Sequence, residues 1–363
     1  MERTASPSQT STAAAPPTRT RIVGGAVAIG LLAVVLRLLA ISRAPWLDEA
    51  VTLGVLDAAT WHEWMRAMAR EPSPPAFQVL LTLWALPGRS IPWLRLLPVV
   101  CGVGTVAAGM IWARRISRRS IAPVGILLAT SPFFLRYGVE LRAYGLLGLA
   151  TIVTFASAWS IADADGGEER SSDRWLLMAA LLLACATHFT AMLLIPSAAA
   201  LIAIGSKARA RLRLPLATFA IALTAWAALI VLVHAPLGQV RDNWWMPALA
   251  WGVMWRTLAE VFGLVATGDA PNAVSVTIGA GIATACFGVF VAAPRTRAWV
   301  APLGAAVVYM GGLMAVSLIW RPVWWPRTLL PAALAATVAF GIAIGSIRET
   351  AVDSDSYPRH SVW

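Results

Sequence analysis

Apolar segments of about twenty residues recur along this chain, and short arginine-rich turns separate several of them. That length is what an α-helix needs to cross the hydrocarbon core of a bilayer. Hydrophobic residues make up 58% of the 363 residues and charged residues only 13%, a more apolar composition than the core of a soluble domain requires. The sequence therefore predicts an all-α integral membrane protein.

The basic residues give the orientation of these segments. The formal net charge is +11, and Lys207 is the only lysine, so arginine carries nearly all of the positive charge. The arginines are not grouped on one surface, as a nucleic-acid-binding protein requires, but fall between apolar segments, for example at residues 114–119, 207–213 and 295–297. This is the positive-inside pattern of membrane proteins. We predict that these turns are cytoplasmic and that no nucleic acid is bound.

Placing the arginine-rich turns in the cytoplasm gives about ten transmembrane helices. Residues 77–86 are apolar over only about half a span, between Pro74-Pro75 and Pro87-Gly88. A crossing there would put residues 114–119 outside, so we predict an interfacial helix instead. The predicted crossings are residues 22–41, 92–113, 120–136, 142–162, 175–188, 189–206, 215–234, 272–293, 298–319 and 327–347.

This topology divides the chain into three parts. Residues 1–21, rich in Ser, Thr, Ala and Pro, are predicted to be a disordered cytoplasmic tail, and residues 348–363 a second cytoplasmic tail. Residues 22–347 form the membrane domain, with a first outer loop at about 42–91 and a Trp-rich outer loop at about 235–271. We expect a multi-pass protein of the cell membrane with both termini in the cytoplasm.

Two adjacent carboxylates, Asp48 and Glu49, follow the first predicted helix on the outer side. In a partly dry site each would oppose ionisation of the other, raising the pKa of one and suiting it to act as a general base. The alternative is that both are solvated acids near the membrane surface.

Further polar residues stand at the outer ends of predicted spans. Glu140, Arg142 and Tyr144 open one span, Arg327 opens the last, and His188 lies at a predicted outer turn. An outer arginine gains nothing from the positive-inside rule, whereas a guanidinium can bind phosphate oxygens in pairs. Snorkelling of the arginines and simple hydrogen bonding by the histidine are the alternatives.

The Trp-rich loop contains Trp244 and Trp245, which are either interfacial anchors or a platform for a sugar or lipid. Beyond Asp48 and Glu49 the predicted outer face has few acids, so the sequence gives only weak support for a cation site. We predict neither a metal nor a required cofactor.

Taken together and in order, these elements resemble the multi-pass GT-C glycosyltransferases, most of all the bacterial relatives of dolichyl-phosphate-mannose protein mannosyltransferases. The likeness extends over about residues 22–347. It is carried by Trp-Leu-Asp-Glu-Ala at 46–50, Glu-Pro-Ser-Pro-Pro at 71–75, Ser-Pro-Phe-Phe-Leu-Arg-Tyr at 131–137, Glu140 with Arg142 and Tyr144, Thr-His-Phe at 187–189, and Arg327.

The resemblance implies a GT-C helical bundle, a polyprenyl-phosphate-linked sugar donor, and transfer with inversion to an acceptor hydroxyl at the outer face. By position, Asp48 would be the general base with Glu49 supporting it. Arg142 and Arg327 would hold the donor phosphate, with His188 close to the same cavity.

The same resemblance makes Glu140, Tyr144, Trp244 and Trp245 candidate substrate contacts. Mannose is the sugar that the likeness favours, while arabinose or an aminosugar stays open, and the acceptor is a protein, a glycolipid or a polysaccharide. The chain departs from many relatives at Ser73, which precedes the Pro-Pro pair, and this departure bears mainly on the acceptor.

A multi-pass transporter or lipid-linked-sugar flippase is the main alternative, and an inactive scaffolding relative is another. A transporter is expected to carry charges near the bilayer midplane. Here the charges gather at one face, although Arg37 and Arg95 lie inside or near predicted spans without an explanation in the sequence.

Overall fold

The structure is a computed structural model, and it describes residues 19–70, 73–164, 171–206, 219–221, 223–225, 227–228, 246–262 and 273–356. Every regular element among the described residues is a helix, so the expected all-α class is confirmed. The predicted crossing at 215–234 lies largely outside the described residues.

The first half of the chain follows the predicted order of helices. A proline breaks the expected helix at 120–136: α6 ends at Thr130, and Pro132 begins the short α7. Proline forces the preceding residue out of the helical conformation and lacks the N–H of a helix interior. The elements are α1 (Arg19–Leu38), α2 (Leu47–Leu56), α3 (Trp61–Arg70), α4 (Ala76–Trp84), α5 (Ile91–Ile116), η1 (Arg118–Ser120), α6 (Ile121–Thr130), α7 (Pro132–Tyr137) and α8 (Tyr144–Asp163).

The second half contains the remaining long helices. The last of them runs past residue 347 and includes the start of the predicted C-terminal tail. The elements are α9 (Ser171–Thr187), η2 (Phe189–Leu193), α10 (Leu194–Gly205), α13 (Trp251–Val261), α14 (Ala273–Ala292), α15 (Arg297–Ile319), η4 (Pro326–Leu329) and α16 (Leu330–Ser356).

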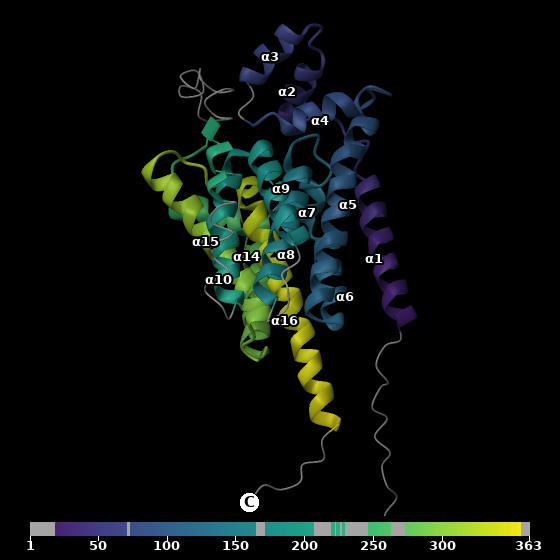
Figure 1. The fold of residues 1–363 in the computed structure, drawn as a ribbon, viewed down its shortest axis with the longest axis vertical. Coiled ribbons are helices and arrows are strands. Elements are labelled where there is room, and N and C mark those ends of the chain that lie inside the picture. The colour runs from purple at the N-terminus through teal and green to yellow at the C-terminus, as the bar shows by residue number, and fades with distance from the viewer. Residues whose placement is uncertain are drawn as a thin grey trace, which may run out of the picture.

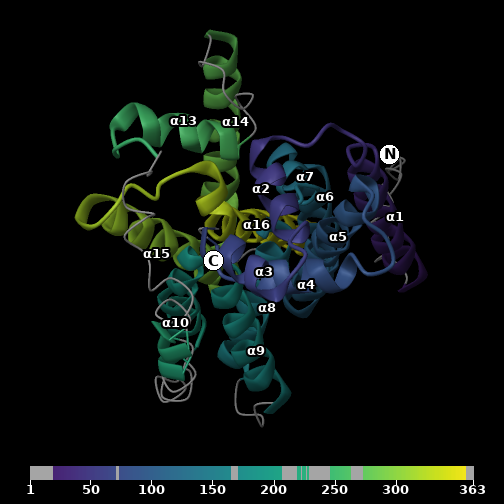
Figure 2. The same ribbon diagram turned by 90° about the horizontal axis from the view of Figure 1, so that it is seen from above.

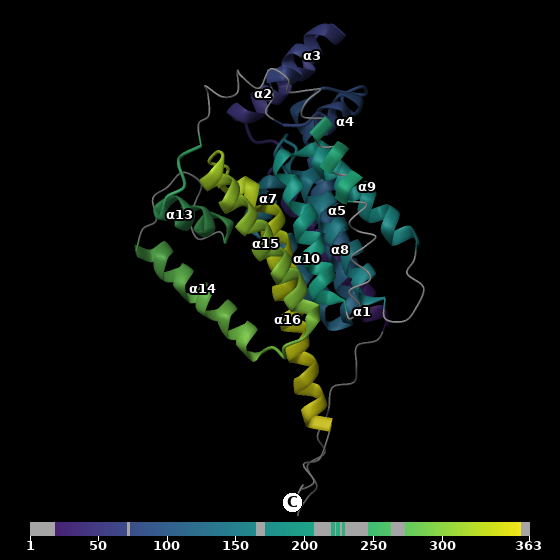
Figure 3. The same cartoon turned by 60° about the vertical axis from the view of Figure 1, so that its left-hand side comes forward.

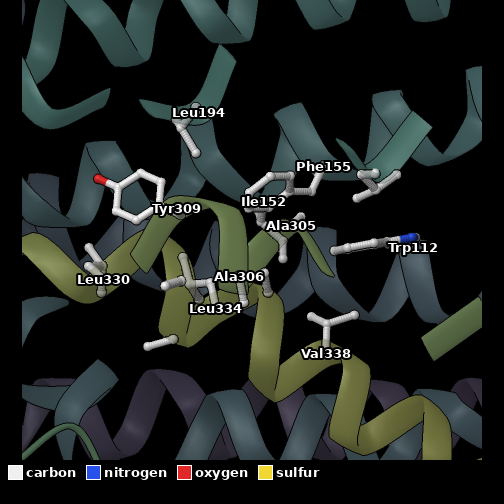
Figure 4. Close-up of a cluster of buried hydrophobic side chains, with 14 of the residues drawn as sticks. Trp112, Ile152, Phe155, Leu194, Ala305, Ala306, Tyr309, Leu330, Leu334 and Val338 are labelled. Carbon is white, nitrogen blue, oxygen red and sulfur yellow. The ribbon is translucent and has the colours of Figure 1, made fainter. Parts of the chain in front are cut away.

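The core forms around α8, whose sequence is apolar on every side and is buried over most of its length. A helix of that kind packs at the centre of a bundle, because it has no polar face to offer to solvent. Ile152 and Phe155 of α8 lie with Trp112 of α5, Tyr309 of α15 and Val338 of α16 in one buried cluster (Figure 4).

Several helices are long and apolar enough to cross a membrane. Among the described residues four segments meet this description in full, namely Ile91–Ile116, Tyr144–Asp163, Arg297–Ile319 and Pro326–Ile347. Shorter apolar helices, such as Ile22–Leu38 and Phe189–Gly205, lie beside them. The chain is therefore a multi-pass membrane protein.

The short helices α2, α3 and α4 gather at one end of the bundle, while α1 begins and α16 ends at the other (Figure 1). With nine residues, α4 is about 14 Å long, roughly half the thickness of the hydrocarbon core, which agrees with an interfacial helix. Seen from above, α2 and α3 lie over the bundle (Figure 2), whereas α13 and α14 stand to one side of it (Figure 3).

Candidate active site

The first turn of α2 directs Asp48 and Glu49 to different surroundings. Adjacent residues on a helix point about 100° apart, so neighbouring carboxylates do not face each other. Glu49 is fully buried, and its Oε2 accepts a hydrogen bond from the backbone N–H of Trp46 at 3.2 Å. Asp48 keeps 26% of its side chain exposed. One acid is thus turned into the protein and the other toward its surface.

Glu49 forms a buried ion pair with Arg95 of α5. The guanidinium donates from Nη2 to Glu49 Oε2 at 2.6 Å and from Nε to Oε1 at 3.1 Å. Arg95 also donates to the backbone carbonyls of Ile41 and Arg43, in the segment between α1 and α2. These contacts explain Arg95, for which the sequence offered no partner. They join α5 to the loop that leads into α2.

The same carboxylate reaches the turn between α7 and α8, because the backbone N–H of Leu141 donates to Glu49 Oε1 at 2.8 Å. Burial raises the pKa of Glu49, but the hydrogen bonds from Arg95, Leu141 and Trp46 outweigh it and hold the pKa below its ordinary value. The sequence predicted a raised pKa for one of the two neighbouring acids, and Glu49 is not that acid. The hydrogen bonds to Glu49 thus favour its ionised form.

Arg327 comes to Asp48 from the far end of the sequence. It lies in η4, where Pro326 occupies the first helical position, and its Nη1 donates to Asp48 Oδ2. The guanidinium carbon also lies 6.0 Å from the centre of the Tyr144 ring, a cation–π contact that holds it in place. The predicted base and one predicted phosphate-binding arginine therefore meet, and Tyr144 lies beside them.

Arg142 approaches the same carboxylate-bearing helix from the α7–α8 turn. It is buried, and its Nη1 donates to the backbone carbonyl of Asp48 at 3.2 Å and to Thr52 Oγ1 at 3.0 Å. Arg142 and Arg327 thus both bond Asp48, Arg142 through its backbone carbonyl and Arg327 through its carboxylate. Their combined positive charge suits an anion bound next to the base.

His188 lies in the turn between α9 and η2 and is buried, with its ring 6.1 Å from that of Tyr144. Its Nδ1 lies 2.8 Å from Thr190 Oγ1 and accepts a hydrogen bond from the Thr190 N–H at 3.3 Å. Tyr309 in turn donates to Thr190 Oγ1 at 3.0 Å. Because Nδ1 is an acceptor, we assign the neutral tautomer with its hydrogen on Nε2, which leaves that nitrogen as a donor.

Glu140, in the α7–α8 turn, is a further buried acidic group near the site. Glu140 is fully buried and pairs with Arg136, whose Nε lies 3.4 Å from Glu140 Oε1. Arg136 also bonds Glu260 of α13 at 3.2 Å and lies over the Trp46 ring. Arg136 thus ties α13 to the entrance of α2. Glu140 Oε2 has no hydrogen-bond partner among the described residues.

Burial raises the pKa of Glu140 to about 7, against an opposing effect of Arg136. From about pH 4.5 to about 7 the unfolded chain has released the proton that native Glu140 retains. This group therefore makes the free energy of unfolding fall as pH rises through that window, by about 3 kcal/mol.

We expect Glu140→Gln to flatten this pH dependence. The unfolding temperature measured from pH 5 to 8 should fall less steeply in the variant than in the wild type, while Glu63→Gln, at an exposed position on α3, should leave the slope unchanged. Parallel slopes for the wild type and Glu140→Gln would contradict the assignment.

Arg37 of α1 is a further contact that the sequence did not explain. It is fully buried, donates to the backbone carbonyl of Ala33 at 3.1 Å, and lies against Gly102 and Gly138. A Cβ atom at Gly102 would stand 2.8 Å from Arg37 Nε, so only glycine leaves room for this side chain. Arg37 thereby supports the turn that begins at Gly138 and carries Glu140.

Of the nine residues predicted for the site, the structure brings Asp48, Arg142, Arg327, Tyr144 and His188 together and places Glu49 and Glu140 at their edge. Trp244 and Trp245 lie outside the described residues. Within the described part of the chain no group of three or more His, Cys, Asp or Glu side chains could hold a metal ion.

Comparison with known proteins finds similarity to a solved structure but not to a protein family. No protein-family model matches the chain, and no curated protein matches it in sequence. The chain is similar to ArnT from Cupriavidus metallidurans, whose crystal structure is in the apo state, with a TM-score of 0.63 and 16% sequence identity. The match covers 89% of this chain and 60% of ArnT, so the chain spans about three fifths of that protein. At this identity the likeness concerns the fold, and the chain is a polytopic membrane protein with the GT-C fold.

Proposed function

We propose that this protein transfers a sugar from a polyprenyl-phosphate-linked donor to an acceptor hydroxyl at the outer face of the cell membrane. The observation that carries the proposal is that two guanidinium groups meet at Asp48: Arg327 bonds its carboxylate, and Arg142 bonds its backbone carbonyl. A base beside two cations is what displacement of a phosphate leaving group needs. The GT-C fold, which ArnT shares, supports the same class of reaction.

In the proposed reaction Asp48 takes the proton of the acceptor hydroxyl, and the acceptor oxygen forms a bond to the anomeric carbon. The bond from that carbon to the phosphate oxygen breaks, and polyprenyl phosphate leaves with the electron pair. Only Oδ2 of Asp48 is bonded to Arg327 among the described contacts, so Oδ1 serves as the proton acceptor. A single displacement inverts the anomeric carbon, and a β-linked donor gives an α-linked product. The scheme uses no metal ion.

The charge on the leaving phosphate is balanced by the surrounding donors. A guanidinium carries five N–H groups, so Arg327 can bind Asp48 and a phosphate oxygen at the same time. Arg142 adds a second cation, and Nε2 of His188 adds a neutral hydrogen-bond donor. Such pre-placed donors stabilise charge that develops in the transition state.

We expect Arg327→Ala to weaken binding of the donor. Loss of one charge-assisted contact to phosphate costs about 1.5–3 kcal/mol, or about 10- to 150-fold in affinity. Titration of the reconstituted protein with polyprenyl phosphate measures this change directly. Arg321→Ala, at an arginine in the segment between α15 and η4, is the matched control and should bind as the wild type does. Equal affinity of Arg327→Ala and wild type would exclude Arg327 from the phosphate site.

Mannose is the sugar that we favour, because the sequence resembles protein mannosyltransferases. The acceptor is a protein, a glycolipid or a cell-envelope polysaccharide. To test the function, the purified protein is reconstituted into vesicles with polyprenyl-phosphate-linked radiolabelled mannose and membrane acceptors. Label is expected to move into acceptor in proportion to enzyme, and the labelled product identifies the acceptor. If mannose does not transfer, the same assay with arabinose and aminosugar donors follows.

A flippase for lipid-linked sugars is the alternative from another class. It predicts that labelled donor crosses the vesicle membrane with its phosphate–sugar bond intact. Failure of transfer with every donor, together with such translocation, would replace the glycosyltransferase proposal.

A further inference from the structure

An apolar cavity of about 540 Å³ lies between α1 and α5, in the half of the bundle away from Asp48. Its α1 wall includes Val23, Val27 and Gly30, which share one face of the helix because they are spaced by four and three residues. Gly30 has no heavy atom within 4 Å of the position where a Cβ atom would stand. This wall is thus unfilled by neighbouring protein side chains.

The facing wall belongs to α5. Ala107, Met110 and Ile111 line it, and Arg114 follows on the same face one turn later. From Ala107 to Arg114 the helix rises about 10 Å, which is the depth of the apolar wall below the arginine. The volume falls within the range of about 300–1,000 Å³ typical of sites for small organic ligands.

Two arginines, Arg114 and Arg118, stand at the rim of this cavity, and both are exposed. Among the described residues no carboxylate pairs with either of them. Their neighbour Arg115 is directed elsewhere, with its Nη1 3.8 Å from Asp173 Oδ1 and hydrogen-bonded to Ser160. The rim therefore carries two arginines that no carboxylate among the described residues neutralises, next to the apolar walls of the cavity.

The position of the cavity across the bundle identifies its environment. Arg95, which anchors Glu49, lies near the start of α5, whereas Arg114 lies near its end. Nineteen residues of helix separate them, about 28 Å, which is close to the thickness of the hydrocarbon core. The cavity therefore opens into the leaflet opposite the candidate active site, where the head group of the proposed donor does not lie.

We infer that this cavity between α1 and α5 binds an anionic phospholipid of the leaflet opposite the candidate active site. One acyl chain lies against the apolar walls of α1 and α5, and the head-group phosphate is bound by Arg114 and Arg118. Charge complementarity selects an anionic lipid, because basic pockets between transmembrane helices at the membrane surface attract such head groups. The bound lipid fills the gap between the first helix and the rest of the bundle.

Native mass spectrometry of the purified full chain in neutral detergent tests this inference, with phosphatidylglycerol and phosphatidylcholine as probes. The wild type is expected to retain phosphatidylglycerol in preference to phosphatidylcholine. Each arginine near a lipid head group contributes about 1 kcal/mol, so Arg114→Gln with Arg118→Gln should lower the affinity for phosphatidylglycerol about 30-fold. Arg295→Gln with Arg297→Gln removes the same charge from exposed residues outside the cavity and should leave binding unchanged.

A second pair of variants tests the apolar walls of the cavity. Gly30→Leu adds a side chain whose Cβ has no heavy atom within 4 Å, and leucine favours the helix, so the protein should fold and lose the lipid. Gly25→Leu, at an equally open position outside the lining, should retain it. Equal retention of the two lipids, or unchanged binding by either the arginine variant or Gly30→Leu, would overturn the inference. Binding of glycerol 3-phosphate as tight as that of phosphatidylglycerol would show that the acyl chain adds nothing to the affinity. It would overturn the inference that the apolar cavity binds a lipid.

Discussion

Replacing Asp48 by Asn is expected to lower the turnover of sugar transfer by about 10²- to 10⁴-fold, the usual contribution of a general base. The amide has the shape of the carboxylate and still accepts a hydrogen bond from Arg327, but it cannot take the acceptor proton. Because Asp48 is partly exposed, the protein should remain folded in the membrane. The measurement is the rate of transfer at saturating donor, with the unfolding temperature recorded on the same sample.

Asp57→Asn is the matched control for this variant. Asp57 lies at the C-terminal end of the same helix and is exposed, about 14 Å along the axis from Asp48. It should transfer sugar at the wild-type rate. An Asp48→Asn protein with unchanged turnover would show that another group accepts the proton, and Glu140 would be the next candidate because of its raised pKa and its position beside the site.

Replacing Glu49 by Gln is expected to destabilise the protein by about 3–5 kcal/mol. The change removes the charge that pairs with Arg95 in a fully buried position, and an unpaired buried guanidinium is costly. The same carboxylate holds the backbone of Leu141, so the turn that carries Arg142 should loosen as well. Thermal unfolding in detergent measures the effect.

A double-mutant cycle separates this ion pair from general damage. Arg95→Gln alone should also destabilise the protein, whereas adding it to Glu49→Gln should cost less than it does in the wild type, since the charge that it removes has already lost its partner. Strict additivity of the two changes would contradict the pairing. Glu63→Gln, whose carboxylate accepts only exposed backbone N–H groups of Ala59 and Thr60, should cost no more than about 1 kcal/mol.

Much of the fold could be predicted from the sequence, because the length of an apolar segment decides whether it can cross the membrane. The long crossings such as α5 and α8 follow directly from runs that only a membrane or a protein core can accept. The break between α6 and α7 was missed although Pro132 stands at it, because the run is apolar on both sides. The interfacial assignment of residues 77–86 rested on the arginines of 114–119, and it agrees with the short α4.

Less of the candidate site could be predicted from local sequence patterns. Asp48, Arg142 and Arg327 were proposed as a group only through the resemblance, since 94 and 279 residues separate Asp48 from the two arginines. The ion pairs of Glu49 with Arg95 and of Arg136 with Glu260 could not be predicted, because partners 46 and 124 residues apart share no periodicity. Glu49 is predicted to support the base, and its contacts in the structure join α2 to α5 and to the α7–α8 turn.

In the proposed reaction a single displacement assisted by Asp48 moves the sugar to the acceptor and releases polyprenyl phosphate. It is tested most directly by nuclear magnetic resonance of the product formed by the reconstituted protein from a β-linked polyprenyl-phosphate sugar labelled at the anomeric carbon. We expect an α-linked product and one free polyprenyl phosphate for each sugar transferred. A β-linked product, or no product from any lipid-phosphate sugar, would contradict it.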